Sequence, residues 1–266
     1  MNDSERKPIL QMIGISKRFG AIQALSQVDF EVYPQEVVGL VGDNGAGKST
    51  LVKIISGVYR PDSGRYVFGG REVVVNNPRA ATQLGIETVY QDLALCDNLD
   101  VVANLYLGRE ETRPVVPGLV RTLSEVSMEQ RTIQLLRELH VHLPSVRDQV
   151  ATLSGGQRQS VAVSRAVMWN SQVVLLDEPT AALGVEQTRQ VTDLIRRLRE
   201  RGLGVVVISH SLADIFDVSD RIVVLRLGQR VATFDTHATN AESVVAAITG
   251  AVFGAVEAGV DKAVQA

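Results

Sequence analysis

The stretch from Gly42 to Ser49 constrains the fold of this chain more than any other part of its sequence. It reads Gly-Asp-Asn-Gly-Ala-Gly-Lys-Ser, which fits the pattern G-x-x-x-x-G-K-[ST]. The apolar run at residues 37–41 ends directly before it, and a helical pattern follows at about residues 48–56. Glycines let successive backbone N–H groups turn toward one point at a helix N-terminus, where an anion binds. The sequence therefore predicts a phosphate-binding loop between a buried strand and a helix of an α/β domain.

The side chains of this loop suit a nucleoside triphosphate bound with magnesium. We expect the Lys48 ammonium to reach the β- and γ-phosphates and the Ser49 hydroxyl to bind Mg²⁺. Such a pattern can arise by chance, but the strand that ends at Gly42 and the helix that follows favour the functional interpretation. The predicted ATP contacts in this region are Gly42, Asp43, Asn44, Gly45, Ala46, Gly47, Lys48, Ser49 and Thr50.

A second apolar run, residues 173–176, ends in the acidic pair Asp177-Glu178. Ligands of parallel sheets bind at the carboxyl ends of the strands, where the phosphate-binding loop also opens. Asp177 would then hold magnesium, and Glu178, one residue further, could polarise an attacking water. An acidic pair after a strand is by itself a common turn. Its place downstream of the phosphate-binding loop favours the catalytic interpretation.

Bulk composition narrows the class of protein. The 266 residues are 45% hydrophobic with a net charge of −3, which argues against broad nucleic-acid binding. Cys96 is the single cysteine, so no disulfide can form within the chain. No run approaches the roughly 18 apolar residues that cross a bilayer. We expect a soluble, cytoplasmic protein that reaches a membrane through a partner.

The N-terminal quarter has more strand pattern than an alternating α/β unit needs. Residues 9–15 and 28–33 read as strands, and residues 66–68 and 71–75 as a hairpin, which together suggest a small antiparallel layer. The later core continues with a helix at 187–199, a strand at 205–208, and a closing strand pair at 222–225 and 230–234. We expect one domain over residues 1–250 and a weakly ordered tail at 251–266, rich in Ala, Gly and Val.

From about residue 92 to residue 160, strand patterns give way to helical periodicity. This predicts a helical subdomain inserted into the α/β core. Ser127 is followed three residues later by Gln130, which fits a capping box and places a helix start at Ser127. Residues 110–118, with Pro114 and Pro117, read as a loop.

The segment Leu153-Ser154-Gly155-Gly156-Gln157 resembles the signature of ABC-transporter ATP-binding subunits. It lies between the phosphate-binding loop and the acidic strand, as in that family. A serine and two glycines that open a helix would form a second phosphate cradle. The resemblance implies that Ser154, Gly155, Gly156 and Gln157 contact ATP, and that the fold is a P-loop NTPase (RecA-like) core.

Other positions match the same family in order. Phe19 is similar to the aromatic residue that stacks on adenine, although by itself it reads as a core residue. Gln91 resembles the glutamine that contacts magnesium and the water, and His210 the histidine that faces the γ-phosphate. The resemblance implies catalytic roles for Glu178, His210, Lys48 and Gln91, and a magnesium site formed by Ser49, Gln91 and Asp177.

The same resemblance, over about residues 9–250, implies a head-to-tail pair of chains. ATP would lie between the phosphate-binding loop of one chain and the signature segment of the other, because each chain carries one set of motifs. The family usually reads Ser-Ala-Leu-Asp after Pro179-Thr180, whereas here the sequence is Ala-Ala-Leu-Gly184. The missing aspartate normally makes a contact across the pair, which puts the coupling between the two sites in doubt.

Residues 102–110 and 180–185 are similar to the ATPases of bacterial monosaccharide importers. The implied partners are a second ATP-binding subunit, a membrane permease and, indirectly, a periplasmic or lipid-anchored solute-binding protein. The implied location is the cytoplasmic face of the inner membrane. Alternatives are an importer ATPase for another small solute, a non-transport ABC ATPase that acts on nucleic acid or the ribosome, and a catalytically silent regulator. Trp169, His140 and His142 are interpreted as packing and surface residues.

Overall fold

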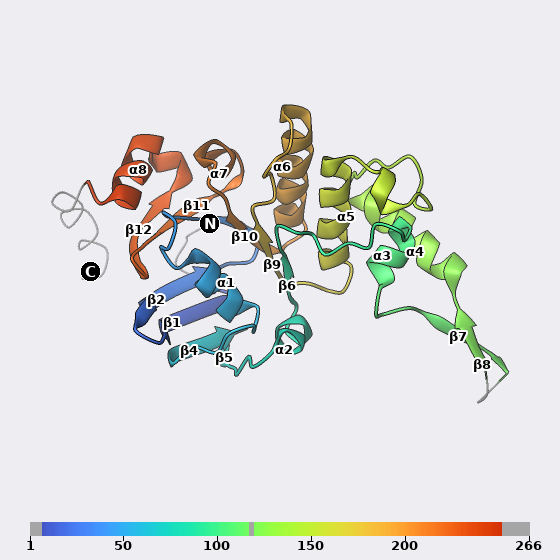
Figure 1. Cartoon of the computed structure of the whole chain (residues 1–266), viewed down its shortest axis with the longest axis horizontal. Helices are drawn as coiled ribbons and strands as arrows, with labels where there is room; N and C mark the ends of the chain where they lie inside the picture. Colours follow the sequence, from blue (N-terminus) through green and yellow to red (C-terminus); the bar gives the residue numbers. More distant parts are fainter. Residues whose placement is uncertain (1–6, 117–119, 252–266) are drawn as a thin grey trace.

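Helix α1 (Lys48–Ile55) lies between two sheets in the computed structural model, which describes residues 7–116 and 120–251 (Figure 1). The larger sheet contains, in spatial order, β12 (Gln229–Asp235), β11 (Arg221–Arg226), β3 (Glu36–Val41), β10 (Gly204–Ile208), β9 (Val173–Asp177) and β6 (Ile86–Val89). All neighbours in it are parallel except β11 and β12. The α/β core predicted from the sequence is therefore confirmed.

Side chains of the central strands alternate between two hydrophobic cores. Val38 and Leu40 of β3 pack with α1 and the smaller sheet. Val37 and Val41 pack on the other face, with α5 (Gly155–Val167) and α6 (Val185–Glu200). Successive side chains of a strand point to opposite faces, so a strand covered on both sides needs an uninterrupted apolar run. This double burial fixes the strand ends from which the functional loops start.

The smaller sheet is the predicted antiparallel layer. Its strands lie in the order β2 (Ile22–Val32), β1 (Leu10–Phe19), β4 (Ser63–Phe68) and β5 (Arg71–Glu72). The first two strands run further than residues 9–15 and 28–33, because their pairing continues through irregularities to Phe19 opposite Ile22. The last strand ends at Glu72 rather than at residue 75, so that part of the hairpin prediction is wrong.

The inserted region contains the expected helices, α3 (Val101–Tyr106), α4 (Glu125–Glu138) and α5, but it also contains a hairpin. Strands β7 (Thr112–Val116) and β8 (Val120–Leu123) pair antiparallel and project away from the body in Figure 1. The prediction of a loop at residues 110–118 is therefore wrong. The Arg121 Nε donates to Thr112 Oγ1 at 2.7 Å and helps to close the ribbon. Pro114 is tolerated because a two-stranded ribbon has outer edges that need no N–H donor.

Helix α4 begins at Glu125 after Ser124, so the predicted start at Ser127 is also wrong. The Ser127 hydroxyl does not cap the helix but donates to Glu111 Oε2 at 2.8 Å. The same Glu111 forms an ion pair with Arg131. Ser127 was predicted from local spacing to cap the helix. In the structure it instead forms a tertiary contact with Glu111, in the segment before the hairpin.

The remaining elements complete the core. Helix α6 and strands β9, β10, β11 and β12 lie where the sequence predicted them, whereas α2 (Pro78–Gln83), β6, α7 (Leu212–Val218) and α8 (Ala241–Thr249) were not anticipated. Within residues 7–116 and 120–251 no helix combines the length and apolarity needed to span a membrane. The domain limits stay a prediction, and residues 252–266 of the expected tail lie outside the described residues.

Candidate nucleotide site

Four neighbouring parallel strands bring most of the predicted site residues to one edge of the large sheet. Leu40 of β3 pairs with Ile208 of β10, Ile208 with Asp177 of β9, and Leu176 with Val89 of β6. The chain continues from these strand ends to the phosphate-binding loop, His210, Glu178 and Gln91. Parallel strands place their carboxyl ends on the same edge, so these residues lie along one edge of the sheet.

The phosphate-binding loop has a backbone that only glycine fits at two positions. A Cβ on Gly42 would lie 2.2 Å from the Leu225 carbonyl oxygen, and one on Gly47 would lie 2.7 Å from the Ala24 carbonyl oxygen. Both residues also have positive φ, 150° and 104°. Gly47 is the N-cap of α1, so the loop presents the free N–H groups of a helix start.

Lys48 and the acidic strand end share a buried electrostatic environment. The Lys48 ammonium donates to the Gly42 carbonyl at 2.6 Å and to the Asp43 carbonyl at 3.1 Å. Burial lowers the pKa of Lys48, and the carboxylates of Glu178, Asp43 and Asp177 oppose that shift. Burial raises the pKa of the Asp177 carboxyl, chiefly against the opposing charge of Lys48. Each group is thus destabilised in its charged form by burial and stabilised by the other.

Glu178 has a backbone conformation that ordinary residues avoid. Its φ is +52°, which costs of order 1–3 kcal/mol for a residue with a side chain. The Glu178 amide donates to the Ile208 carbonyl at 2.9 Å, and the His210 amide donates to Glu178 Oε2 at 3.4 Å. Oε1 is buried, lies 3.3 Å from His210 Nε2, and lacks a well-aligned hydrogen-bond partner among the described residues. An acceptor oxygen is therefore held at the site beside His210.

The signature segment lies apart from this group. Its helix α5 packs on the face of the large sheet opposite to α1. Ser154 is the N-cap: its hydroxyl accepts from the Gln157 amide at 3.3 Å, and the Gln157 side chain accepts from the Ser154 amide at 2.9 Å. This capping box satisfies two N–H groups of the helix start and leaves Ser154 exposed. The structure thus places the predicted residues of the phosphate-binding loop and of the neighbouring strand ends along one edge of the sheet, and it leaves the signature residues on a different part of the surface.

Phe19 is the last residue of β1 and is 40% exposed. Its ring meets Tyr59 edge-on, with the ring centroids 5.1 Å apart, and the Lys17 ammonium lies 5.5 Å from the centroid of the Phe19 ring. An aromatic residue this exposed is not a core residue, which favours a ligand-stacking role over the packing interpretation. Tyr59 was missed in the sequence because a single tyrosine after a helix carries no distinguishing pattern.

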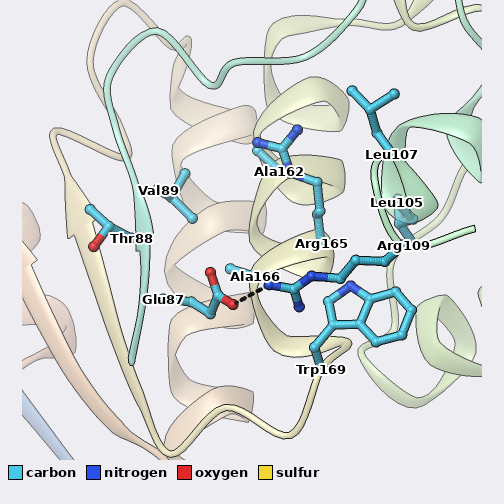
Figure 2. Close-up of a pocket in the computed structure, with 10 residues that line it drawn as sticks. All are labelled: Glu87, Thr88, Val89, Leu105, Leu107, Arg109, Ala162, Arg165, Ala166 and Trp169. Carbon is cyan, nitrogen blue, oxygen red and sulfur yellow. Dashed lines mark hydrogen bonds and ion pairs between the residues drawn. The ribbon is translucent and has the colours of Figure 1, made fainter. Parts of the chain in front are cut away.

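A groove between β6 and helices α3 and α5 was not anticipated from the sequence (Figure 2). Glu87 faces Arg109 across it at 3.3 Å, and burial raises the pKa of the Glu87 carboxyl against the opposing charge of Arg109. The Arg109 guanidinium also lies 5.3 Å from the Trp169 ring centroid. Trp169 packs edge-on against Tyr106 as a packing residue would, and it also lines the groove. The chain of β6 leaves this groove and reaches Gln91 two residues later.

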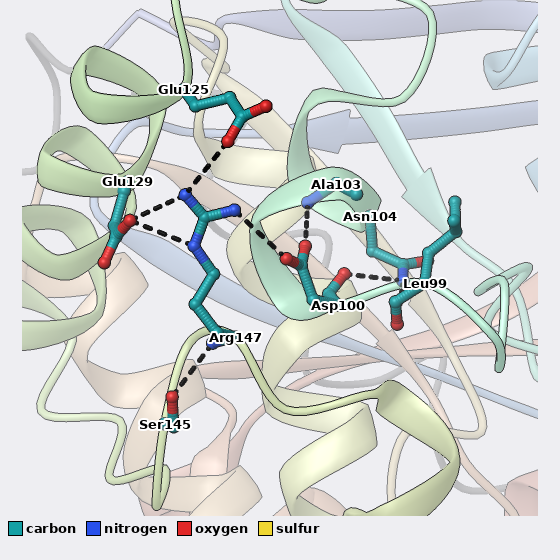
Figure 3. Close-up of polar contacts among 8 residues, drawn as sticks. All are labelled: Leu99, Asp100, Ala103, Asn104, Glu125, Glu129, Ser145 and Arg147. Atoms are coloured by element: carbon teal, nitrogen blue, oxygen red, sulfur yellow. Dashed lines mark hydrogen bonds and ion pairs between the residues drawn. The ribbon is translucent and has the colours of Figure 1, made fainter.

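The α3 wall of the groove is tied to the segment that leads to the signature. Figure 3 shows Arg147 between α3 and α4: its guanidinium lies 3.2 Å from Asp100 and 2.7 Å from Glu129. Asp100 caps α3 by accepting from the Ala103 amide at 2.7 Å. The fully buried Asn104 side chain bonds the preceding turn, including the Cys96 amide at 2.7 Å. The helical insertion is therefore held at α3 by polar side chains.

Comparisons with known proteins agree on one family. A family model described as ABC transporter matches residues 25–181. The chain is 43% identical to a xylose/arabinose import ATP-binding protein of Sulfolobus acidocaldarius over 94% of this chain and 98% of the relative. It is 44% identical to a fructose import ATP-binding protein of Rhizobium meliloti, over 92% of this chain and 95% of the relative. A ribose import ATP-binding protein of Rubrobacter xylanophilus is 42% identical over 90% of this chain, which spans only 46% of that relative.

Solved structures with the same fold are ATP-binding cassettes. A cassette of an ABC transporter in its ADP conformation superposes with a TM-score of 0.76 at 25% identity, over 91% of this chain and 95% of that one. A dimeric cassette in a post-hydrolysis state, bound to ADP and phosphate, superposes with a TM-score of 0.69 at 25% identity, over 86% of this chain and 100% of that one.

Proposed function

This chain belongs to the ABC transporter family as an ATP-binding subunit, and from that premise we propose that it hydrolyses ATP to drive the import of a monosaccharide. The observation that carries the proposal is the convergence of Lys48, Asp177, Glu178 and His210 at one sheet edge, beside a loop that only glycine can form. Two relatives of nearly the same length serve xylose/arabinose and fructose import, which supports a monosaccharide as cargo.

The phosphate groups of ATP would be bound by the loop of residues 42–50, with Lys48 paired to the β- and γ-phosphates. The residues proposed to bind magnesium offer oxygen ligands: the Ser49 hydroxyl, the Asp177 carboxylate and the Gln91 side chain. Magnesium is held in such sites by few protein ligands together with the phosphates, which this donor set fits. When bound, the ion supplies neutralisation of phosphate charge. The adenine would stack on Phe19, whose exposed ring lies at the end of β1.

Glu178 would act as the general base for the attacking water. Its buried Oε1 is an acceptor held rigidly by the strained turn after β9, so that its position is set before water binds. His210, 3.3 Å from that oxygen, would face the transferred phosphoryl group and stabilise its charge together with Lys48. This arrangement favours an active ATPase over a silent regulator.

A complete site would require a second copy of the chain. Ser154, Gly155, Gly156 and Gln157 lie on α5, on the opposite side of the sheet from the phosphate-binding loop of the same chain. A head-to-tail pair would bring the signature helix start of one copy over the loop of the other and close two sites at once. The likeness to a dimeric cassette bound to ADP and phosphate supports this pairing.

The groove at Glu87, Arg109 and Trp169 is the surface where we place the permease subunit, at the cytoplasmic face of the inner membrane. It presents an aromatic side chain beside charges of both signs, which suits a short amphipathic segment of a partner. An occupant would touch β6, two residues before Gln91, and so would report directly to the ATP site. A periplasmic or lipid-anchored solute-binding protein would act on the outer side.

Reconstitution tests the proposal. The tagged chain is purified from membranes of its own cells, and the co-purifying multi-spanning protein is reconstituted with it in liposomes that contain ATP and magnesium. Uptake of radiolabelled pentoses and hexoses through the solute-binding protein is expected, and Lys48→Ala should abolish it without loss of assembly. ATP-driven uptake of a non-sugar solute alone would overturn the monosaccharide assignment. Co-purification with nucleic acid or ribosomes and no permease would favour the non-transport alternative.

A further inference from the structure

The two glycines of the signature segment are pressed against the start of helix α6 and the residue before its N-cap in the same chain. A Cβ on Gly156 would lie 3.0 Å from the Gln187 Cβ and 3.2 Å from its Cγ. A Cβ on Gly155 would lie 3.1 Å from the Leu183 Cδ2. All three distances are tighter than ordinary van der Waals contact, so the helix start can approach Leu183 and Gln187 this closely only because it has no side chains there.

Gln187 also holds the segment in which this chain departs from its family. Its Oε1 accepts a hydrogen bond from the Gly184 amide at 3.3 Å. Gly184 is the N-cap of α6 and has no side chain that could cap the helix. The usual aspartate would supply that cap itself. In this chain the Gln187 side chain is therefore fixed at one end by Gly184 and along its length by Gly156.

The segment between Gln187 and the catalytic base is short and tightly turned. The Ala181 amide donates to the Glu178 carbonyl at 3.1 Å, and the Leu183 amide donates to the Thr180 carbonyl at 3.3 Å. The Thr180 hydroxyl is in turn bound to Asp214 of α7 at 2.6 Å. A displacement at Glu178 would be transmitted through these hydrogen-bonded turns to Gly184 and Gln187, because the connecting segment is short.

We propose that Gln187 is a positioning residue that fixes the signature glycines of one chain relative to the acidic strand end of the same chain, and so sets how firmly a second copy closes over ATP. The inference rests on the proposed head-to-tail pair. In that pair the signature of one copy covers the nucleotide of the other, so Gln187 links the state of one ATP site to the closure of the next. Gln187 thereby couples the two sites in a chain that has glycine, not aspartate, at position 184.

ATP-induced dimerisation in the Glu178→Gln background gives a direct test. Sedimentation with ATP and magnesium measures the dimer dissociation constant, which we expect Gln187→Ala to raise by about 5–20-fold, as expected when one hydrogen bond and its packing are removed. ATP binding by the dilute monomer should stay unchanged, because the phosphate-binding loop is untouched. Gln187→Met keeps the aliphatic contact but not the hydrogen-bond acceptor. Its dimer dissociation constant should lie between those of the Glu178→Gln parent and Gln187→Ala.

Gln190→Ala is the matched control: it removes the same side chain one turn further along α6, where the exposed Gln190 lines the same hollow as Gln187 but is not among the atoms nearest to either signature glycine. It should leave the dimer dissociation constant unchanged. An unchanged constant in Gln187→Ala, or an equal effect of Gln190→Ala, would overturn the role of Gln187. A rise in the monomer's dissociation constant for ATP would overturn it as well. Failure of the Glu178→Gln parent to dimerise with ATP would instead reject the head-to-tail pair and, with it, this part of the proposed function.

Discussion

The phosphate-binding loop and the signature segment are both glycine-containing helix starts, but they are held in opposite ways. The loop leaves β3, whose six residues are all buried, and its glycines meet backbone oxygens of neighbouring strands. The signature starts from Ser154, an exposed N-cap, and its glycines meet the side chains of Leu183 and of Gln187 in α6. The helical insertion that carries it shares a buried apolar cluster with the large sheet, and ion pairs such as those of Arg147 connect its own elements at the surface.

The contrast lies in which atoms limit the space around each set of glycines. At Gly42 and Gly47 the nearest atoms include backbone oxygens of β11 and β2, which can move only if a strand moves. At Gly155 and Gly156 the nearest atoms are side-chain carbons of Leu183 and Gln187. In the proposed pair, a shift of the signature would need movement of these two residues, whereas a shift of the loop would need movement of a strand.

The largest effect is expected beside the phosphate-binding loop, for Glu178→Gln. Removal of the proposed base should lower the ATPase rate by about 10²–10⁴-fold, since the amide cannot accept the proton of the attacking water. ATP binding should persist, because Lys48 and the loop are intact, and a closed dimer should accumulate. Steady-state hydrolysis and size-exclusion chromatography with ATP measure the two quantities. Undiminished turnover would remove Glu178 from the catalytic role.

A middle-sized effect is expected for Gly47→Ala, with Gly45→Ala as its control. Both positions have positive φ, 104° and 79°, so both variants carry backbone strain of about 1–3 kcal/mol. Only the Cβ at position 47 also meets a backbone oxygen, whereas nothing lies within 4 Å of one at position 45. Titration with a fluorescent ATP analogue should show the greater loss of affinity for Gly47→Ala. Equal losses would mean that the loop is not held by its close approach to Ala24.

The smallest effect is expected for Arg147→Ala, in the helical insertion that carries the signature. Arg147 is 40% exposed and its pairs with Asp100 and Glu129 are at the surface, so about 1 kcal/mol of local stability should be lost. Hydrogen exchange should quicken in α3 and the segment before Ser154, and stay unchanged in α1. Arg201→Ala, which removes a single pair with Glu138, should have less effect. Faster hydrogen exchange in α1 would show that the stability of the phosphate-binding loop depends on that of the helical insertion.

Much of the fold could be predicted because local pattern and burial agree. The uninterrupted apolar runs of β3, β9 and β10 are possible only for strands covered on both faces, and their order along the chain placed the site at one edge. The β7–β8 hairpin and the start of α4 could not be predicted. Both depend on contacts between Thr112 and Arg121 and between Glu111 and Ser127, which no local spacing records.

The sequence by itself determined which residues make up the candidate site: a glycine-rich loop before a helix, an acidic pair after a buried strand, and a histidine after the next one. These depend on residue type and on strand ends, both of which are written locally. Only the tertiary structure decided that Glu178 and His210 lie 3.3 Å apart, that a groove opens beside Trp169, and that Gln187 supports the signature glycines. Such contacts join residues from different elements, and their distances follow from how those elements pack rather than from their spacing in the chain.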